Sequence, residues 1–160
     1  MTKILVFSDS HGAERPMIDA ITKHSDADVI AFLGDGESDF EEALSECGIS
    51  PFGPRKKEIW QVRGNCDWRS MEAATILPVI GDLRFYVTHG HTQYVKTGYS
   101  TIAVEARKKN CAAALFGHTH EAYLGEIEGV ILMNPGSVHS GHYGLITVEN
   151  GKLQCELFEI

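Results

Sequence analysis

Five short polar clusters in the sequence carry side chains that could do chemistry, and each follows an apolar run that predicts a strand. The five clusters are Asp9-Ser10-His11-Gly12, Gly34-Asp35-Gly36, Gly64-Asn65-Cys66-Asp67, His89-Gly90-His91 and Gly117-His118-Thr119-His120. Strand ends of an α/β sheet open onto a shared crevice, so we expect these side chains to converge. Carboxylates, an amide oxygen and neutral imidazoles together suit a pair of divalent ions such as manganese, iron, zinc or nickel.

Each cluster taken singly also has a plainer interpretation. Asp9 could cap a helix that follows it, and Gly34-Asp35-Gly36 or Gly64-Asn65 could be an ordinary turn. His118 and His120 lie two residues apart after a strand, so in an extended chain they point to the same side, either as two ligands or as two cross-sheet contacts. The recurrence of such clusters after successive strands favours the metal site.

The apolar pattern predicts the elements that position these clusters. In the first half, strands such as Lys3–Phe7 and Val29–Leu33 alternate with amphipathic helices, and Ser38 with Glu41 predicts a capping box at the start of one helix. A last helix carries Tyr99, Ile102, Ala103 and Ala106 on one face. Further strands are predicted at 59–62, 75–79, 84–88, 112–116, 122–127, 130–133, 143–148 and 153–158. The pattern predicts an α/β (α+β) fold of two facing sheets with outer helices.

Bulk properties narrow the classes of function. A length of 160 residues fits a single domain over 1–160, and no apolar run is long enough to span a bilayer. The formal charge of −8 disfavours bulk binding of nucleic acid, although bound cations would invert the field locally. The four cysteines form no C-x-x-C pair, and no secretion signal is evident, so we expect a cytoplasmic location.

The motifs D-x-H, G-D, G-N-x-D, H-G-H and G-H-T-H, in this order, resemble those of the calcineurin-like metallophosphoesterases. The narrower resemblance is to the YfcE-like phosphodiesterase family, and it runs from the first strand to at least Ser137. It implies a four-layer α/β/β/α sandwich of two mixed sheets with outer helices. It also implies a dinuclear centre in which a metal-bridging hydroxide attacks phosphorus.

The resemblance also implies roles for individual residues. The first ion would be held by Asp9, His11 and His120, the second by Asn65, His89 and His118, and Asp35 would bridge them. Asn65 would also orient the substrate, and Asp67 would hold a neighbouring ligand by hydrogen bonds. Mn²⁺ is the favoured metal, with Ni²⁺, Zn²⁺, Fe²⁺ and Mg²⁺ as alternatives.

Two departures from the family pattern concern the substrate. Many members have a histidine that protonates the leaving oxygen where this chain has Cys66, and a thiol with a pKa of about 8.5 is poorer at this task. We therefore expect a preference for good leaving groups. A proline-arginine pair is missing from the loop that runs from Gly136 to His142, where His139 or His142 could replace the arginine.

The expected function is hydrolysis of a small phosphodiester, and two alternatives stay open. A phosphomonoesterase for small metabolites would need an extra cationic group, for which Arg69 and His91 are the candidates. A protein-binding scaffold of the retromer sorting-subunit type would keep the fold and use its surface. Trp68 is interpreted as a half-buried packing residue, with a place in a substrate pocket as its alternative. A homo-oligomer is also left open.

Overall fold

The computed structural model describes residues 1–50 and 52–160, which contain two β-sheets and three α-helices. The first sheet has the strand order β11-β10-β1-β2-β3. Its strands are β1 (Thr2–Phe7), β2 (Val29–Phe32), β3 (Glu58–Gln61), β10 (His142–Glu149) and β11 (Lys152–Glu159). Strands β1, β2 and β3 run parallel, whereas β10 is antiparallel to both β1 and β11, so the sheet is mixed.

The second sheet has the order β4-β6-β7-β9-β8, with β5 paired to β6. Its strands are β4 (Thr75–Ile76), β5 (Val79–Ile80), β6 (Leu83–Thr88), β7 (Ala113–Leu115), β8 (Tyr123–Ile127) and β9 (Val130–Asn134). Strands β6, β7 and β9 are parallel, and β4, β5 and β8 are antiparallel to their neighbours. This sheet is mixed as well.

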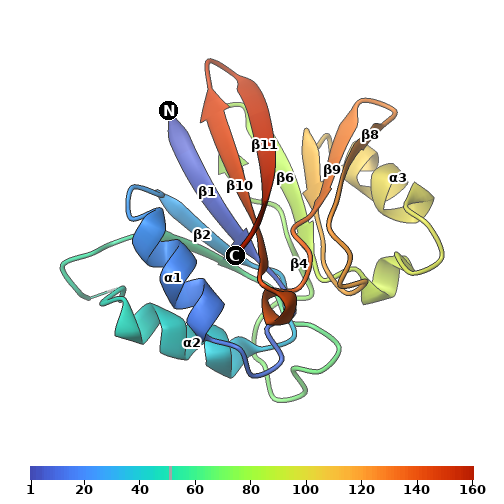
Figure 1. Cartoon of the computed structure of the whole chain (residues 1–160). Helices are drawn as coiled ribbons and strands as arrows, with labels where there is room; N and C mark the ends of the chain where they lie inside the picture. Colours follow the sequence, from blue (N-terminus) through green and yellow to red (C-terminus); the bar gives the residue numbers. More distant parts are fainter. Residues whose placement is uncertain (51) are drawn as a thin grey trace.

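The two sheets face each other and the helices lie outside them (Figure 1). One apolar cluster lies between the sheets and includes Val6 and Phe85. A second packs α1 (Arg15–Lys23) and α2 (Glu37–Glu46) on the first sheet, and a third packs α3 (Ser100–Lys108) on the second sheet. The predicted four-layer α/β/β/α sandwich is therefore confirmed.

The parallel strands decide where the polar clusters lie. Because β1, β2 and β3 are parallel neighbours, their carboxyl ends meet at one edge of the first sheet. The carboxyl ends of β6 and β7 likewise meet at one edge of the second sheet. All five clusters begin within three residues after these strand ends, as expected for ligand sites in α/β sheets.

Two local predictions were wrong. The capping box of Ser38 and Glu41 does not form, because α2 already begins at Glu37 with Gly36 as its N-cap and without a side-chain cap of that kind. The single strand predicted at 75–79 is two short strands, β4 and β5, with Leu77 and Pro78 between them. A proline lacks the N–H that a continuous ladder needs, which explains the break.

None of the helices in residues 1–50 and 52–160 combines the length and the apolar character that crossing a membrane requires. The single-domain interpretation of residues 1–160 stays a prediction.

Candidate metal centre

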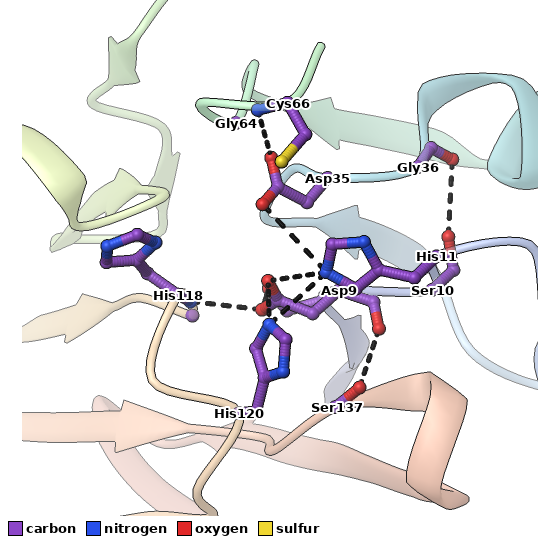
Figure 2. A network of polar contacts seen from close by, with 12 residues as sticks. Asp9, Ser10, His11, Asp35, Gly36, Gly64, Cys66, His118, His120 and Ser137 are labelled. Carbon is purple, nitrogen blue, oxygen red and sulfur yellow. Dashed lines mark hydrogen bonds and ion pairs between the residues drawn. The ribbon is translucent and has the colours of Figure 1, made fainter.

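Side chains from both sheets meet where the strands end. Asp9 follows β1, Asp35 follows β2 and Asn65 follows β3, while His89 comes directly after β6 and His118 follows β7. Figure 2 shows His11 and His120 directed toward the carboxylate of Asp9, and the carboxylate of Asp35 directed toward His11. The convergence expected from the sequence is present in the structure.

The first group of metal-ligand atoms comprises Asp9, His11 and His120, whose ligand atoms all lie within 4.8 Å of one another. The Oδ1 atom of Asp9 is 3.2 Å from Nε2 of His120 and 3.6 Å from Nε2 of His11. The two imidazole Nε2 atoms are 3.2 Å apart. Three ligand atoms thus surround one small volume.

The second group comprises Asp35, His89 and His118, with the same 4.8 Å limit between ligand atoms. Nε2 of His89 lies 3.3 Å from Oδ2 of Asp35 and 3.0 Å from Oδ1 of Asn65. Asn65 therefore adds an amide oxygen to this group, as expected from its position after β3.

Asp35 lies between the two groups. Its Oδ2 atom is 3.3 Å from Nε2 of His89 in the second group and 4.0 Å from Nε2 of His11 in the first. The carboxylate is almost fully buried, and its Oδ1 atom accepts a hydrogen bond from the backbone N–H of Cys66 at 2.7 Å. This placement suits a carboxylate that bridges two cations.

In both groups, ring nitrogens and side-chain oxygens that can accept hydrogen bonds lie close together without a donor between them. Nδ1 of His89 lies 2.7 Å from the carbonyl oxygen of Leu33, so this nitrogen carries a proton, and in the neutral ring Nε2 presents a lone pair to the oxygens of Asp35 and Asn65. Oδ1 of Asp9 is buried and has no hydrogen-bond partner among the described residues. Buried acceptors without donors are costly, and a cation between them would remove that cost. The residues present therefore fit divalent metal ions.

The close approach of these carboxylates and imidazoles shifts the pKa values of Asp35, His89 and His118. Burial alone would raise the pKa of Asp35, but the bond from His89, its charge and the Cys66 N–H hold it well below its ordinary value. Burial would lower the pKa of His89, and the carboxylates of Asp35 and Asp9 raise it instead, so without a metal ion a proton on Nε2 can take the position between His89 and Asp35 that a cation would otherwise occupy. Burial, the neighbouring His89 and Lys96 lower the pKa of His118 to about 4, so that imidazole is neutral at pH 7 and able to bind metal.

The backbone at the site is strained. Nine described residues other than glycine have a positive φ, and five of them are in the two groups. These five are Asp9, His11, Asp35, His118 and His120, with φ between 43° and 69°. A left-handed backbone costs such residues roughly 1–2 kcal/mol each. Strain of this kind gathers at functional sites, where the fold compensates for it.

Hydrogen bonds outside the groups hold the ligands in place. Oδ2 of Asp9 accepts bonds from Oγ of Ser8 at 2.5 Å and from the backbone N–H of His118 at 3.0 Å. Oγ of Ser137 donates to the carbonyl oxygen of Asp9 at 2.7 Å, as Figure 2 shows. Sequence analysis missed Ser8 and Ser137, and their places beside an aspartate and in a Gly-Ser loop were the only signals.

Asp67 does more than the sequence suggested. Its carboxylate accepts four backbone N–H bonds, from Asp35 and Gly64 at 2.7 Å, Gly36 at 3.0 Å and Glu37 at 3.3 Å. These bonds join the segment after β3 to the segment after β2 and to the first turn of α2. Asp67 thus replaces the missing capping box from a distant part of the chain.

The other candidate residues from the sequence are placed as follows. Cys66 is exposed beside Asn65, with its Sγ 3.5 Å from the amide nitrogen. The ring of His91 lies with its centroid 5.5 Å from that of His89, next to the second group. The ring of His142 instead lies 4.0 Å from the Glu159 carboxylate, and His139 is exposed. Trp68 is 90% exposed, so its interpretation as a half-buried packing residue was wrong.

The family model described as the calcineurin-like phosphoesterase superfamily domain matches residues 2–151. The chain belongs to this superfamily. The family assignment confirms the resemblance seen in the motifs, and it supports the phosphoesterase class of hydrolase. The two groups of candidate ligands agree with the metal dependence that the names of its relatives state.

Two relatives with similar sequences cover different fractions of this chain. A probable metallophosphoesterase, YsnB of Bacillus subtilis, is 28% identical over 162 residues, covering 98% of this chain and 90% of the relative. The phosphodiesterase MJ0936 of Methanocaldococcus jannaschii is 32% identical over 69 residues, covering 43% of this chain and 38% of the relative.

Solved structures share the fold. A predicted phosphoesterase from Streptococcus pneumoniae superposes with a TM-score of 0.77 at 20% identity, covering 99% of this chain and 89% of that one. A Vps29 from Entamoeba histolytica complexed with Zn²⁺ gives a TM-score of 0.76 at 18% identity, covering 99% of both chains. At these identities the likeness concerns the fold alone.

Proposed function

We propose that this chain is a phosphodiesterase that uses two divalent metal ions, with Mn²⁺ as the favoured metal. Asp9, His11 and His120 would hold one ion, Asn65, His89 and His118 the other, and Asp35 would bridge them. The observation that carries the proposal is the place of Asp35, whose Oδ2 atom lies within 4.0 Å of ring nitrogens from both groups. The expected cytoplasmic location belongs to this proposal as well.

Bound ions of this kind lower the pKa of water and offset negative charge on the phosphoryl oxygens. The protein's own residues orient the candidate ligands. The Leu33 carbonyl holds the proton of His89 on Nδ1, so that Nε2 stays available. Asn65 has its amide oxygen toward His89 and its amide nitrogen toward Cys66, from where the nitrogen can donate to a substrate oxygen. Ser8 and the His118 N–H orient Asp9.

The charge around the site supports a diester rather than a monoester. A monoester carries more negative charge on its terminal oxygens and needs a further cation near them. Arg69 is exposed, and burial together with the neighbouring His89 lowers the pKa of His91, so that imidazole is neutral at pH 7. Neither candidate supplies a fixed, buried cation beside the two groups.

A protein-binding scaffold is the second candidate function, and the likeness to Vps29 in fold is the reason to keep it. A scaffold does not need buried acceptors aimed at one another. The unpartnered Oδ1 of Asp9 and the strained backbone of five candidate ligands therefore favour a working metal site.

Metal reconstitution tests the proposal directly. The protein is stripped with a chelator, and Mn²⁺, Ni²⁺, Zn²⁺, Fe²⁺ or Mg²⁺ is restored singly. Hydrolysis of bis(p-nitrophenyl) phosphate is then compared with that of p-nitrophenyl phosphate. We expect diesterase activity to return, most strongly with Mn²⁺, and calorimetry to show two ions bound per chain. Binding of a single ion, or a faster monoesterase reaction, would contradict the proposal.

Cys66 predicts a steep dependence on the leaving group. Burial and the nearby carboxylates, Asp35 first, raise the pKa of this thiol, so it is a weak proton donor. We expect rates for a series of aryl and alkyl phosphodiesters to fall steeply as the leaving-group pKa rises. Because a positioned general acid contributes about 10²–10⁴-fold, Cys66→His should accelerate alkyl esters by up to about 10²-fold.

The controls for this series are simple. Nitrophenyl esters need little protonation, so Cys66→His should change their rates only a few-fold. Cys66→Ala should resemble the wild type throughout the series. A wild-type rate that does not depend on leaving-group pKa would show that another group already protonates the leaving oxygen.

A further inference from the structure

A cavity of about 630 Å³ opens beside the candidate metal centre. Its lining includes His11, a member of the first group of candidate ligands, and Asp35, a member of the second. The unpartnered Oδ1 of Asp9 lies 3.6 Å from Nε2 of His11, so the cavity adjoins the place where a ligand is needed. A substrate whose phosphorus lies at the centre would place one of its two alcohol portions here.

The cavity is rich in carboxylates, but most of them are already engaged. Asp67 accepts the four backbone bonds described above, and Asp39 accepts bonds from Oγ of Ser10 at 2.6 Å and the N–H of Gly12 at 2.7 Å. The carboxylates of Glu37 and Glu41 make no hydrogen bond or ion pair with the described residues. They lie one helical turn apart on α2, and therefore on the same face of that helix.

An aromatic side chain completes the lining. Trp68 is 90% exposed, and its Nε1–H donates to the carbonyl oxygen of Asn65 at 2.8 Å. This bond uses the edge of the indole and leaves its faces free. Because Asn65 is itself a candidate ligand, the bond ties the position of the indole to the metal centre. An exposed tryptophan face attracts cations.

The charges of the lining do not cancel. Among the lining residues that the structure describes, Arg69 is the one fixed cation, against two free carboxylates on α2. An anionic alcohol portion would be repelled by these carboxylates. A purely apolar one would leave them without a partner. A group that is positively charged and able to contact an aromatic face would use both features.

We propose that this cavity binds a quaternary or primary ammonium group on one alcohol portion of the phosphodiester, with Glu37 and Glu41 supplying the countercharge and Trp68 the aromatic face. The inference rests on the proposed function for its reaction, and it makes these three residues determinants of specificity. The substrate would then be a zwitterion, with its phosphate at the metal centre and its ammonium group over the indole.

The kinetic test compares two substrates that differ at one atom. In p-nitrophenyl phosphorylcholine the alcohol carries N⁺, and in p-nitrophenyl 3,3-dimethylbutyl phosphate carbon replaces the nitrogen. From the usual strength of cation–π contacts and exposed ion pairs, we expect kcat/KM to favour the choline ester by about tenfold. The preference should decrease as salt is added.

Variants assign the preference to the residues. Glu37→Gln with Glu41→Gln should bring the ratio of the two kcat/KM values to about one, and Trp68→Ala should reduce it. Glu42→Gln is the matched control, because Glu42 is exposed on the same helix but does not line the cavity. A ratio that is near one in the wild type, or unchanged in the double variant, would overturn the inference.

A binding measurement separates this inference from the proposed function. Choline is titrated into Mg²⁺-supplemented protein while the indole N–H resonances are followed, with 3,3-dimethyl-1-butanol as the neutral counterpart. We expect choline alone to shift the Trp68 signal saturably, and the buried Trp60 to stay constant. A shift without hydrolysis of either diester would contradict the phosphodiesterase and retain the cation site. Hydrolysis of both diesters at equal rates, without a shift of the Trp68 signal, would support the phosphodiesterase and contradict the cation site.

Discussion

Replacing Asp35 by asparagine is expected to lower kcat/KM for a phosphodiester by about 10²–10³-fold, the scale of losing one main electrostatic contact in an active site. Asp35 is the carboxylate that lies between both groups of ligands, with Oδ2 3.3 Å from His89 and 4.0 Å from His11. Asparagine keeps the shape but removes the negative charge, so both ions should bind more weakly. Steady-state kinetics and calorimetric titration with Mn²⁺ measure the two effects.

The control for this variant makes the same chemical change elsewhere. Asp19 is an exposed residue of α1 that pairs with Arg15 on the surface. Asp19→Asn should leave both kcat/KM and Mn²⁺ binding unchanged, because its charge is remote from the site and screened. Activity of Asp35→Asn within tenfold of the wild type, in protein free of contaminating phosphatase, would remove Asp35 from the bridging role.

Replacing Asp67 by asparagine should both destabilise the protein and slow the reaction. The two carboxylate oxygens of Asp67 each accept two backbone N–H bonds. In asparagine one oxygen becomes an NH₂ group that faces two donors, so two charge-assisted bonds are lost. At the usual cost of such losses we expect the free energy of unfolding to fall by about 2–4 kcal/mol. Urea denaturation measures this change.

The kinetic effect of Asp67→Asn comes through Asp35. Because Asp67 fixes the backbone N–H of Asp35, its loss displaces a proposed ligand, and outer hydrogen-bond partners of metal ligands typically contribute about 10–100-fold. The backbone amide resonances of Asp35 and Gly36 should also move. Glu46→Gln, at the other end of α2, is the matched control. A variant with unchanged amide resonances but slow turnover would point to a direct catalytic role for Asp67 instead.

Much of the fold followed from local patterns. The helix that carries Ile102, Ala103 and Ala106 was predicted from its apolar face, and all three residues are buried in α3. The strand before Asp9 was predicted from a short apolar run, and its four residues Ile4–Phe7 are buried between layers. Such patterns are readable because burial of one face follows directly from residue spacing.

Local patterns failed where distant segments compete. Ser38 and Glu41 match a capping box, but the start of α2 is instead satisfied by Asp67, which is about thirty residues away in sequence. Likewise Trp68 has the character of a packing residue, yet the loop after β3 holds its indole at the surface by a bond to Asn65. No spacing rule within one segment can foresee such contacts.

The sequence by itself determined the family, the order of strands and helices, and the set of oxygen- and nitrogen-bearing residues that follow the strands, because these depend on residue type and on near neighbours in the chain. Only the tertiary structure decided that Asp35 lies between the two groups, that Oδ1 of Asp9 is buried without a partner, and that five candidate ligands adopt a left-handed backbone. Those features arise because the strand ends of two separate sheets lie side by side. The packing of the whole chain compensates for the free-energy cost of the strained backbone and the buried polar atoms.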